Sequence, residues 1–276
     1  MRRETVGAAM ASLELRVQGC HSLARASATR HIGAPWMNIL IVDDNAVNRF
    51  VLRRQLEAEG HHVQEAETGH AAIGAATDTH FDAILMDLDM PGMDGLDATR
   101  AIRASGGPCS DVRIVLVTAH SIENDDAACR AAGVDAVITK PVLRANLLRG
   151  LHGDPARPTA PPRDALAPLL DMAVLESLHA VLSPDRLREV LAGFRDEGDA
   201  LLRDRQALAG LSAAGAAHSA HRLAGAAATL GARALHQRLE RAVARLLADG
   251  GTDVPEALAG ARQLWPETLS ALARMG

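Results

Sequence analysis

Carboxylates stand at the ends of two short apolar runs, where side chains from distant parts of a folded chain can meet. Asp43 is the last residue of the run at 38–43, and Asp44 follows it directly. Asp87 is the last residue of the run at 81–87. Carboxylates that are brought together repel one another unless a proton or a cation neutralises them. A hard divalent cation such as Mg²⁺, which takes carboxylate and phosphate oxygens, is the ligand we expect.

A hydroxyl and an ammonium follow two further apolar runs in the same way. Thr118 ends the run at 112–118, and Lys140 follows the run at 135–139. Lys140 is the only lysine in the chain, which indicates that an ammonium on a flexible stem suits this position better than a guanidinium. Taken singly, such residues are usually helix caps or solvated charges. Together, carboxylates, a hydroxyl and a lysine indicate a phosphoryl-transfer site.

The spacing of the apolar runs indicates how the chain brings these residues together. From residue 38 to about residue 151, runs rich in Val, Ile and Leu alternate with segments of helical periodicity. Apolar strands separated by helices are typical of a parallel sheet that is covered on both faces. The predicted strands are 38–43, 62–67, 81–87, 112–118 and 135–139. We therefore expect a doubly wound α/β domain with a five-stranded parallel sheet and a ligand site at the carboxyl ends of its strands.

Four motifs in this first region resemble a known family. They are VDDNAVNR (42–49), LMDLDMPGMDG (85–95), VTA (117–119) and TKP (139–141). In this order they are similar to the response-regulator receiver family, which has a flavodoxin-like fold, and the similarity extends over residues 37–152. The resemblance implies that Asp87 accepts a phosphoryl group.

The same resemblance implies a role for each of the other candidate residues. Asp44 and Asp87 would ligate Mg²⁺ directly, and Asp43 would act through a water bound to the metal. The backbone carbonyl of Asp89 would supply a further ligand. The side chains expected to contact the phosphoryl oxygens are those of Thr118 and Lys140.

Val137 departs from the receiver pattern. The family often has Tyr or Phe two residues before the position of Thr139, where the ring moves inward on phosphorylation, and this chain contains no tyrosine. An aromatic output switch is therefore not expected. Because a receiver that passes phosphate onward depends less on rearranging its surface, Val137 favours a role in a relay.

The composition excludes several classes of protein. The net charge of −5, without a run of Lys or Arg, argues against nucleic-acid binding. The three cysteines (Cys20, Cys109 and Cys129) are widely spaced and indicate neither a disulfide framework nor a zinc site, which fits a reducing cytoplasm. No apolar stretch approaches the roughly 20 residues that a membrane-spanning helix needs, so we expect no membrane insertion.

The chain is predicted to divide into four regions. These are a leader at 1–36, the receiver domain at 37–152, a linker at 153–168 and a helical domain at 169–276. The leader is either disordered or untranslated, since Met37 stands directly before the first strand. The linker is rich in proline, which sustains neither a helix nor an interior strand, so a semi-extended conformation is expected.

The last region shows only helical periodicity. Ser183-Pro184 precedes an apolar helical pattern and is suited to a helix start. Further helices are predicted near 212–230, 232–248 and 254–274. We expect an all-α antiparallel helical bundle.

His221 is the candidate for chemistry in this bundle. The segment HRLAGAAATLGA (221–232) resembles the histidine-phosphotransfer family, with Leu223, Gly225 and Gly231 at the positions that the family's pattern requires. Residues three and four apart share a helix face, so Gly225 would leave an exposed imidazole that another protein can approach. A neutral imidazole nitrogen is nucleophilic near neutral pH. The resemblance implies that His221 carries a phosphoryl group.

Three neighbours of His221 qualify this prediction. Ala224 replaces the lysine that the family usually has, which removes a charge near the phosphoryl group. Arg222 could partly replace that charge, although its direction around the helix is less favourable. His218 is a rival acceptor that lacks a glycine one turn on. The plain alternative is that His221 is an exposed helix histidine without a chemical role.

The sequence predicts a phosphorelay protein rather than an enzyme in the ordinary sense, because it contains no motif for an ATP site. A histidine kinase would phosphorylate Asp87, and His221 would carry the group to or from a separate receiver. The alternative is a binding module, in which phosphorylation of Asp87 only changes what the helical domain docks against.

Overall fold

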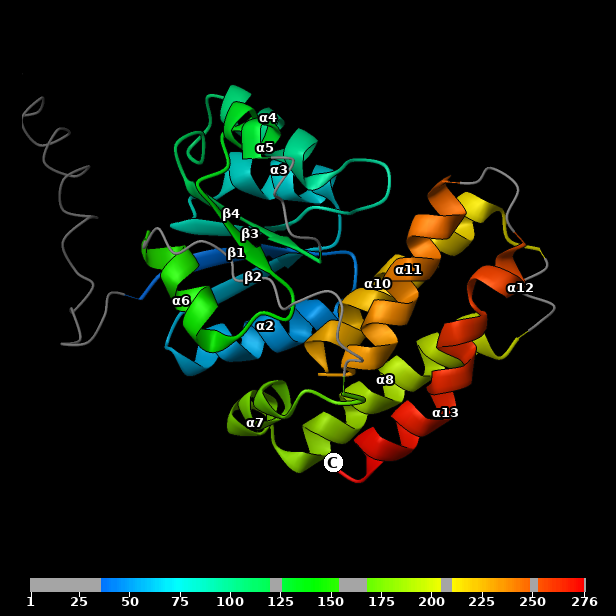
Figure 1. Cartoon of the computed structure of the whole chain (residues 1–276). Coiled ribbons are helices and arrows are strands. Elements are labelled where there is room, and N and C mark those ends of the chain that lie inside the picture. The colour runs from blue at the N-terminus through cyan, green and yellow to red at the C-terminus, as the bar shows by residue number, and fades with distance from the viewer. Residues whose placement is uncertain (1–35, 120–125, 154–167, 205–209, 249–252, 276) are drawn as a thin grey trace, which may run out of the picture. The chain divides into compact units, whose positions relative to one another are not determined.

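A computed structural model describes most of the chain (Figure 1). The described residues are 36–119, 126–153, 168–204, 210–248 and 253–275. The predicted leader and linker lie outside these residues, except for their end positions. The described residues from Met37 onward belong to one compact unit.

Five parallel strands form the sheet of the first region, in the order β2-β1-β3-β4-β5. They are β1 (Asn38–Val42), β2 (His62–Ala66), β3 (Ala83–Asp87), β4 (Arg113–Thr118) and β5 (Ala136–Thr139). Each strand lies inside its predicted run and is one or two residues shorter, because the hydrogen-bonded ladder begins or ends within the run. The prediction of a doubly wound domain with a five-stranded parallel sheet is confirmed.

Helices cover both faces of this sheet (Figure 1). They are α2 (Ala46–Ala58), α3 (Gly69–Asp78), α4 (Gly95–Ala104), α5 (Asp126–Ala132) and α6 (Arg144–His152). Successive side chains of a strand point to opposite faces. Leu40 of β1 therefore joins the core under α3, α4 and α5, whereas Ile39 and Ile41 join the core under α2 and α6.

The region after residue 168 contains helices and no strand among its described residues. The helices are α7 (Met172–Val181), α8 (Pro184–Leu202), α10 (Ala213–Thr229), α11 (Arg233–Ala248), α12 (Val254–Ala257) and α13 (Ala259–Ala273). Ser183 caps α8 and Pro184 is its first residue, so the predicted helix start is confirmed. The predicted helix at 254–274 is wrong in one respect. It divides at Leu258, whose ψ of −3° departs from the helical value of about −42°.

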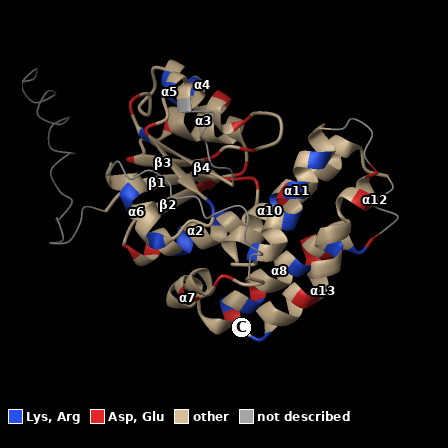
Figure 2. Cartoon of the chain, viewed as in Figure 1, with Lys and Arg blue, Asp and Glu red and all other residues tan. Residues whose placement is uncertain are grey.

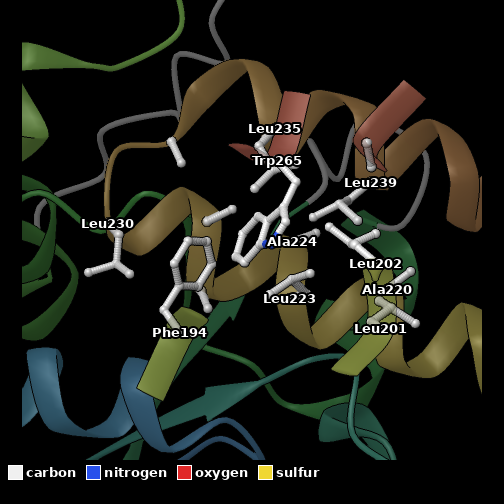
Figure 3. Packing of buried hydrophobic residues seen from close by; sticks show 14 of the residues in the cluster. Phe194, Leu201, Leu202, Ala220, Leu223, Ala224, Leu230, Leu235, Leu239 and Trp265 are labelled. Carbon is white, nitrogen blue, oxygen red and sulfur yellow. The ribbon is translucent and has the colours of Figure 1, made fainter. Parts of the chain in front are cut away.

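Small residues allow the helices of this region to pack closely. In Figure 3, Phe194 and Trp265 lie among leucines and alanines that α8, α10 and α11 contribute. The two rings meet edge to face, with 5.2 Å between their centroids. A Cβ atom on Gly198 would lie 2.1 Å from Cη2 of Trp265, so α8 approaches the indole ring more closely than any larger residue permits. Trp265 Nε1 donates a hydrogen bond of 2.7 Å to Asp199.

The outer surface of α8 is charged with both signs (Figure 2). Arg186 pairs with Glu189 at 2.6 Å, and Arg188 pairs with Asp185 at 2.7 Å. Pairs three residues apart on an exposed helix face each stabilise the helix by about 0.3 kcal/mol. The solvent-exposed side of α8 therefore carries local ion pairs. Its other side supplies the apolar core residues Leu187 and Leu201.

Helix α2 of the sheet region also contacts the helical region. Val51 belongs to the same buried cluster as the helical core, and Val47 and Phe50 pack against that cluster. None of the helices in the described part of the chain is both long enough and apolar enough to cross a membrane.

Candidate functional site

The carboxylates of Asp43, Asp44 and Asp87 form a cluster at the carboxyl ends of β1 and β3. These strands are neighbours, with Val42 of β1 opposite Met86 of β3, so the residues that follow them lie side by side. One oxygen from each carboxylate lies within 4.8 Å of the others. The pairing of β1 with β3 therefore brings the predicted acidic residues together.

Lys140 lies inside this cluster. Its Nζ donates to Asp87 Oδ1 at 2.9 Å and to Asp43 Oδ2 at 3.0 Å. The backbone N–H of Lys140 donates to the carbonyl of Thr118 at 2.7 Å, which holds the lysine beside the end of β4. Thr118 itself is fully buried. The structure thus brings together the aspartates, the threonine and the lysine that the sequence placed at strand ends.

Burial and mutual repulsion change the protonation of the cluster. Burial, and then the charge of Asp43, raise the pKa of Asp87 well above its ordinary value, although Lys140 opposes them. The pKa of Asp44 is raised by the same two causes, with Arg222 opposing. Burial alone would lower the pKa of Lys140, but the carboxylates of Asp43 and Asp87 outweigh it and raise that pKa. Negative charge is thus in excess around one ammonium, which is the environment that a divalent cation stabilises.

Asn48 and Asn45 hold the cluster in place from α2. Asn48 Nδ2 donates to both oxygens of Asp43, at 3.0 and 3.2 Å. Asn45 caps α2, since its Oδ1 accepts from the backbone N–H of Val47 at 2.8 Å. Both asparagines lie in the motif at 42–49, but residue type alone predicted no role for them. Two asparagines three residues apart lie at the same end of a helix, and this spacing is the feature of the sequence that could have predicted their role.

Gly95 ends the motif at 85–95, and its role is visible only in the structure. A Cβ atom at this position would lie 2.2 Å from the backbone oxygen of Asp87, so only glycine fits. Its N–H donates to the carbonyl of Leu88 at 2.8 Å, while Asp94 caps α4. The start of α4 is therefore pressed against the end of β3. Val137, the position without an aromatic ring, is partly buried and packs against the core under α3 and α4.

His221 lies in α10 with one ring nitrogen toward the acidic cluster. Its Nε2 is 3.4 Å from Asp89 Oδ2, and its Nδ1 is 3.7 Å from Glu240 Oε1. The residue is 9% exposed, so the expectation of an exposed imidazole is wrong. The reason is that α11 covers one side of the ring and the loop after β3 approaches the other. His218 also reaches the cluster, with Nε2 3.6 Å from Asp44 Oδ2.

Gly225 lies where α10 meets the receiver residues. A Cβ atom here would lie 3.1 Å from Asn48 Nδ2 and 3.6 Å from Lys140 Nζ. One turn further along α10, Thr229 donates a hydrogen bond of 2.7 Å to Asn48 Oδ1. Asn45 Nδ2 donates to the carbonyl of Arg222 at 3.2 Å. The small residue one turn from His221 therefore allows the helix to lie close to the acidic cluster.

The two other neighbours of His221 occupy different surroundings. Ala224 is fully buried and belongs to the core of the helical region (Figure 3). Arg222 pairs with Glu197 at 3.0 Å, and its Nε is 3.9 Å from Asp44 Oδ2. The guanidinium is thus directed at the rim of the acidic cluster and at α8.

Comparisons with known proteins agree with the geometry of the first region. Residues 39–152 match the family model described as the response regulator receiver domain. The virulence sensor protein BvgS of Bordetella pertussis is 32% identical over 241 residues, which cover 81% of this chain and 19% of BvgS. The sensor histidine kinase AruS of Pseudomonas aeruginosa is 33% identical over 244 residues, which cover 87% of this chain and 23% of AruS.

One solved structure is a receiver domain of a sensor histidine kinase from Pseudomonas aeruginosa, with a magnesium ion in its active-site cleft. It is 37% identical, has a TM-score of 0.40 and covers 43% of this chain and 96% of its own. The matches to BvgS and AruS are longer than the receiver region and so include residues of the helical region. This chain spans less than a quarter of the length of either relative.

Proposed function

With residues 39–152 as a response regulator receiver domain, we propose that this chain is a phosphorelay intermediate. A histidine kinase phosphorylates Asp87, and His221 passes the phosphoryl group to or from a separate receiver. The observation that carries this proposal is the position of His221, whose Nε2 lies 3.4 Å from Asp89, two residues beyond Asp87. Phosphoryl transfer depends mainly on such positioning and on electrostatic stabilisation.

The acidic cluster fits Mg²⁺. Three carboxylates offer oxygens within 4.8 Å of one another, and burial with mutual repulsion raises the pKa of two of them. We assign Asp44 and Asp87 as direct ligands, with Asp43 acting through water and the backbone carbonyl of Asp89 as a further ligand. A bound Mg²⁺ supplies positive charge to the phosphoryl oxygens.

In the first step, a carboxylate oxygen of Asp87 attacks the phosphorus of the kinase phosphohistidine. The new O–P bond forms as the N–P bond breaks, and the electron pair returns to the kinase imidazole. Lys140, which already touches Asp87 at 2.9 Å, and Thr118 hold the oxygens of the transferred group. Because the ammonium already donates to Asp87 and the side chain of Thr118 is fully buried, little reorganisation is needed.

In the second step, Nε2 of His221 attacks the phosphorus of the acyl phosphate. An N–P bond forms while the O–P bond breaks, and the carboxylate of Asp87 is restored. Phosphoramidate and acyl phosphate lie close in free energy, so the step runs in either direction. Partners and turnover then determine the net direction.

The predicted domain boundaries divide the chain into the domains that a relay requires. We propose a receiver at 37–152, a linker at 153–168 and a histidine-phosphotransfer domain at 169–276. A linker of this length keeps the effective concentration of the two domains high. The partners are a histidine kinase and a separate receiver, which places the chain in the cytoplasm.

The alternative is that the helical region only docks partners when Asp87 is phosphorylated. One observation favours it: Val51, on the receiver side, is buried in the helical core, so a change in the receiver would reach the helices through packing. Under this alternative His221 never carries phosphate.

The experiment that separates the two is chemical. The wild type, Asp87→Asn and His221→Gln are incubated with a small phosphodonor and Mg²⁺, and each label is tested for stability in acid and base. The relay predicts base-stable, acid-labile label that requires both Asp87 and His221. In His221→Gln, only the base-labile label of Asp87 persists.

Label confined to Asp87 in the wild type, together with binding that depends on Asp87 phosphorylation, would contradict the relay and support the docking module. A phosphorylated receiver from the same kind of pathway, added as a donor, tests the reverse direction. The His218→Gln variant is the matched control, because it changes the rival histidine on the same helix.

A further inference from the structure

The backbone between β1 and α2 brings two consecutive carboxylates to one place. In an extended strand, successive side chains point to opposite faces. Asp43 and Asp44 nevertheless each contribute an oxygen to the same cluster, within 4.8 Å of one another. The chain leaves β1 after Val42 and bends at Asp44. The orientation of the peptide group between Asp43 and Asp44 therefore determines whether both carboxylates can face one cation.

Arg49 of α2 holds this peptide group. The residue lies near the start of the helix, and long helical side chains point back toward the N-terminus of their helix. Its Nη1 donates a hydrogen bond of 2.8 Å to the backbone carbonyl of Asp43, which is the oxygen of that peptide group. Arg49 is only 7% exposed. The bond is therefore buried and charge-assisted, and such bonds are about twice as strong as those between neutral groups.

Two glutamates fix the direction of the guanidinium. Glu65 of β2 and Glu67 directly after β2 are two residues apart, so they lie on the same face of the strand. Nε of Arg49 donates to Glu65 Oε2 at 3.3 Å, and Nη2 donates to Glu67 Oε1 at 2.6 Å. Because the guanidinium is planar, partners at Nε and Nη2 also fix the direction of Nη1. The glutamates thus orient the donor that reaches the carbonyl of Asp43.

We infer that Arg49 is a positioning residue for the acidic cluster. By holding the carbonyl of Asp43, it sets the directions in which the carboxylates of Asp43 and Asp44 project. Its donors go to a backbone carbonyl and to glutamates, so it acts on the cluster through the backbone. The inference rests on the proposed function, in which Asp44 ligates Mg²⁺ directly and Asp43 acts through water.

Positioning and charge predict effects of opposite sign when Arg49 is removed. A positive charge near an acidic cluster opposes the binding of a cation, so charge alone predicts that Arg49→Met binds Mg²⁺ more tightly. Loss of positioning predicts weaker binding, because the two carboxylates no longer face one cation. Residues that orient metal ligands contribute about tenfold to hundredfold to metal affinity. We expect isothermal titration calorimetry of the full chain to show Mg²⁺ affinity at least about tenfold lower in Arg49→Met.

Arg53→Met is the matched control. Arg53 lies one turn further along α2, and its Nε is 2.6 Å from Glu65 Oε1, so it also joins α2 to β2. Its ion pair involves no atom of the bend at Asp44, and the Mg²⁺ affinity of Arg53→Met should stay within about twofold of the wild type. Arg49→Lys keeps the charge but loses the planar fork, so its affinity should lie between those of Arg49→Met and the wild type.

Amide hydrogen exchange without metal tests the bend itself. The backbone N–H of Asn45 donates to Asp43 Oδ1 at 2.8 Å, so its exchange reports whether this carboxylate stays in place. In Arg49→Met we expect Asn45 to exchange at least about tenfold faster, since a charged hydrogen bond has been lost. The amide of Leu40, inside β1, exchanges through wider opening of the sheet and should change less. In Arg53→Met the ratio of the two rates should match the wild type.

Nitrogen NMR of the wild type gives a measurement that does not depend on the folding of Arg49→Met. A guanidinium held by three partners should give separate, slowly exchanging Nη signals. Their loss in Arg49→Lys identifies them. Averaged Nη signals in the wild type would mean that the guanidinium rotates freely and cannot hold the carbonyl.

Two further results would overturn the inference. One is Mg²⁺ binding in Arg49→Met that is as tight as in the wild type or tighter. The other is equal weakening by Arg49→Met and Arg53→Met, which would indicate only a loosened contact between α2 and β2. A wild type that binds no Mg²⁺ contradicts the proposed function instead, and exchange at Asn45 still decides whether Arg49 holds the bend.

Discussion

The receiver pocket and the surroundings of His221 hold their reactive groups in different ways. In the receiver, Asp87 and Lys140 are buried together with Asp43, and each charge contacts another at about hydrogen-bond distance. Around His221, most of the buried residues of α10 are alanines, and carboxylate oxygens of Asp89 and Glu240 lie 3.4 and 3.7 Å from the two ring nitrogens. The receiver site consists of buried charges in direct contact, whereas His221 is a single ring on a closely packed helix with carboxylates at a longer distance.

This difference determines which changes each site tolerates. A cluster of buried charges loses its function when one charge is removed, since the remaining charges are left without compensation. A ring held by packed helices loses its function when the helices separate. The receiver should therefore lose function when a charge is removed, even if the side-chain volume is conserved. The His221 site should lose function when packing volume changes, even if no charge is altered.

Lys140→Met should produce the largest effect. Methionine keeps the approximate volume but leaves Asp43 and Asp87 without their ammonium, so phosphorylation of Asp87 should fall by at least about a hundredfold. The free energy of unfolding without metal should fall by about 3 kcal/mol, because one partner of a buried ion pair is lost. Acyl phosphate yield and urea unfolding measure these two quantities.

The same variant should bind Mg²⁺ more tightly than the wild type, since a competing positive charge has left the cluster. Isothermal titration calorimetry measures this. Weaker Mg²⁺ binding would show that Lys140 organises the metal ligands rather than competing with the metal. Arg100→Met is the control, because it removes an exposed charge paired with Asp97 and should change stability by less than about 1 kcal/mol.

Gly198→Ala should destabilise the helical region by about 3 kcal/mol, without touching any charge. The added Cβ would lie 2.1 Å from Cη2 of Trp265, so the indole or the backbone of α8 must move. Gly193→Ala on the same helix has no atom within 4 Å of its new Cβ and should stabilise the helix by up to about 1 kcal/mol. Thermal unfolding of both variants measures the contrast.

Labelling of Asp87 should stay near the wild-type level in Gly198→Ala, while transfer to His221 slows. If Asp87 labelling fell equally, the two sites would not differ in the way proposed. A Gly198→Ala protein as stable as Gly193→Ala would mean that the contact with Trp265 relaxes without cost.

The smallest predicted effect is a pH dependence that belongs to the receiver pocket. The pKa values of Asp87 and Asp44 are raised by burial and then by Asp43. The folded chain therefore binds these protons more tightly than the unfolded chain, and metal-free stability should fall as pH rises from about 4 through the raised values. Urea unfolding at several pH values measures the slope.

Saturating Mg²⁺ should remove most of this slope, because the cation replaces the protons. The Asp87→Asn variant should reduce it in the absence of metal. A slope of the opposite sign would mean that Lys140 stabilises the ionised carboxylates more than burial destabilises them.

Much of the receiver could be predicted from the sequence because each strand and the functional residue that ends it are close together along the chain. Five apolar runs and the residues that end them determine strand, turn and site together, since the carboxyl ends of parallel strands converge. The assembly of Asp43, Asp87 and Lys140 followed from this rule. The helical region was less predictable. Its periodicity indicated helices, but the division at Leu258 arises from a local backbone conformation that periodicity does not report.

By itself, the sequence determined the fold of the receiver and the identity of its charged residues, and it singled out His221 as a candidate, because these depend on residue type and short spacing. Only the tertiary structure decided that His221 is buried, that Asn48 meets Thr229 and that Glu240 lies beside the imidazole. These contacts join residues 19 to 181 positions apart, and they depend on how helices pack. The spacing of side chains along one helix does not indicate which residues of a neighbouring helix will lie opposite them.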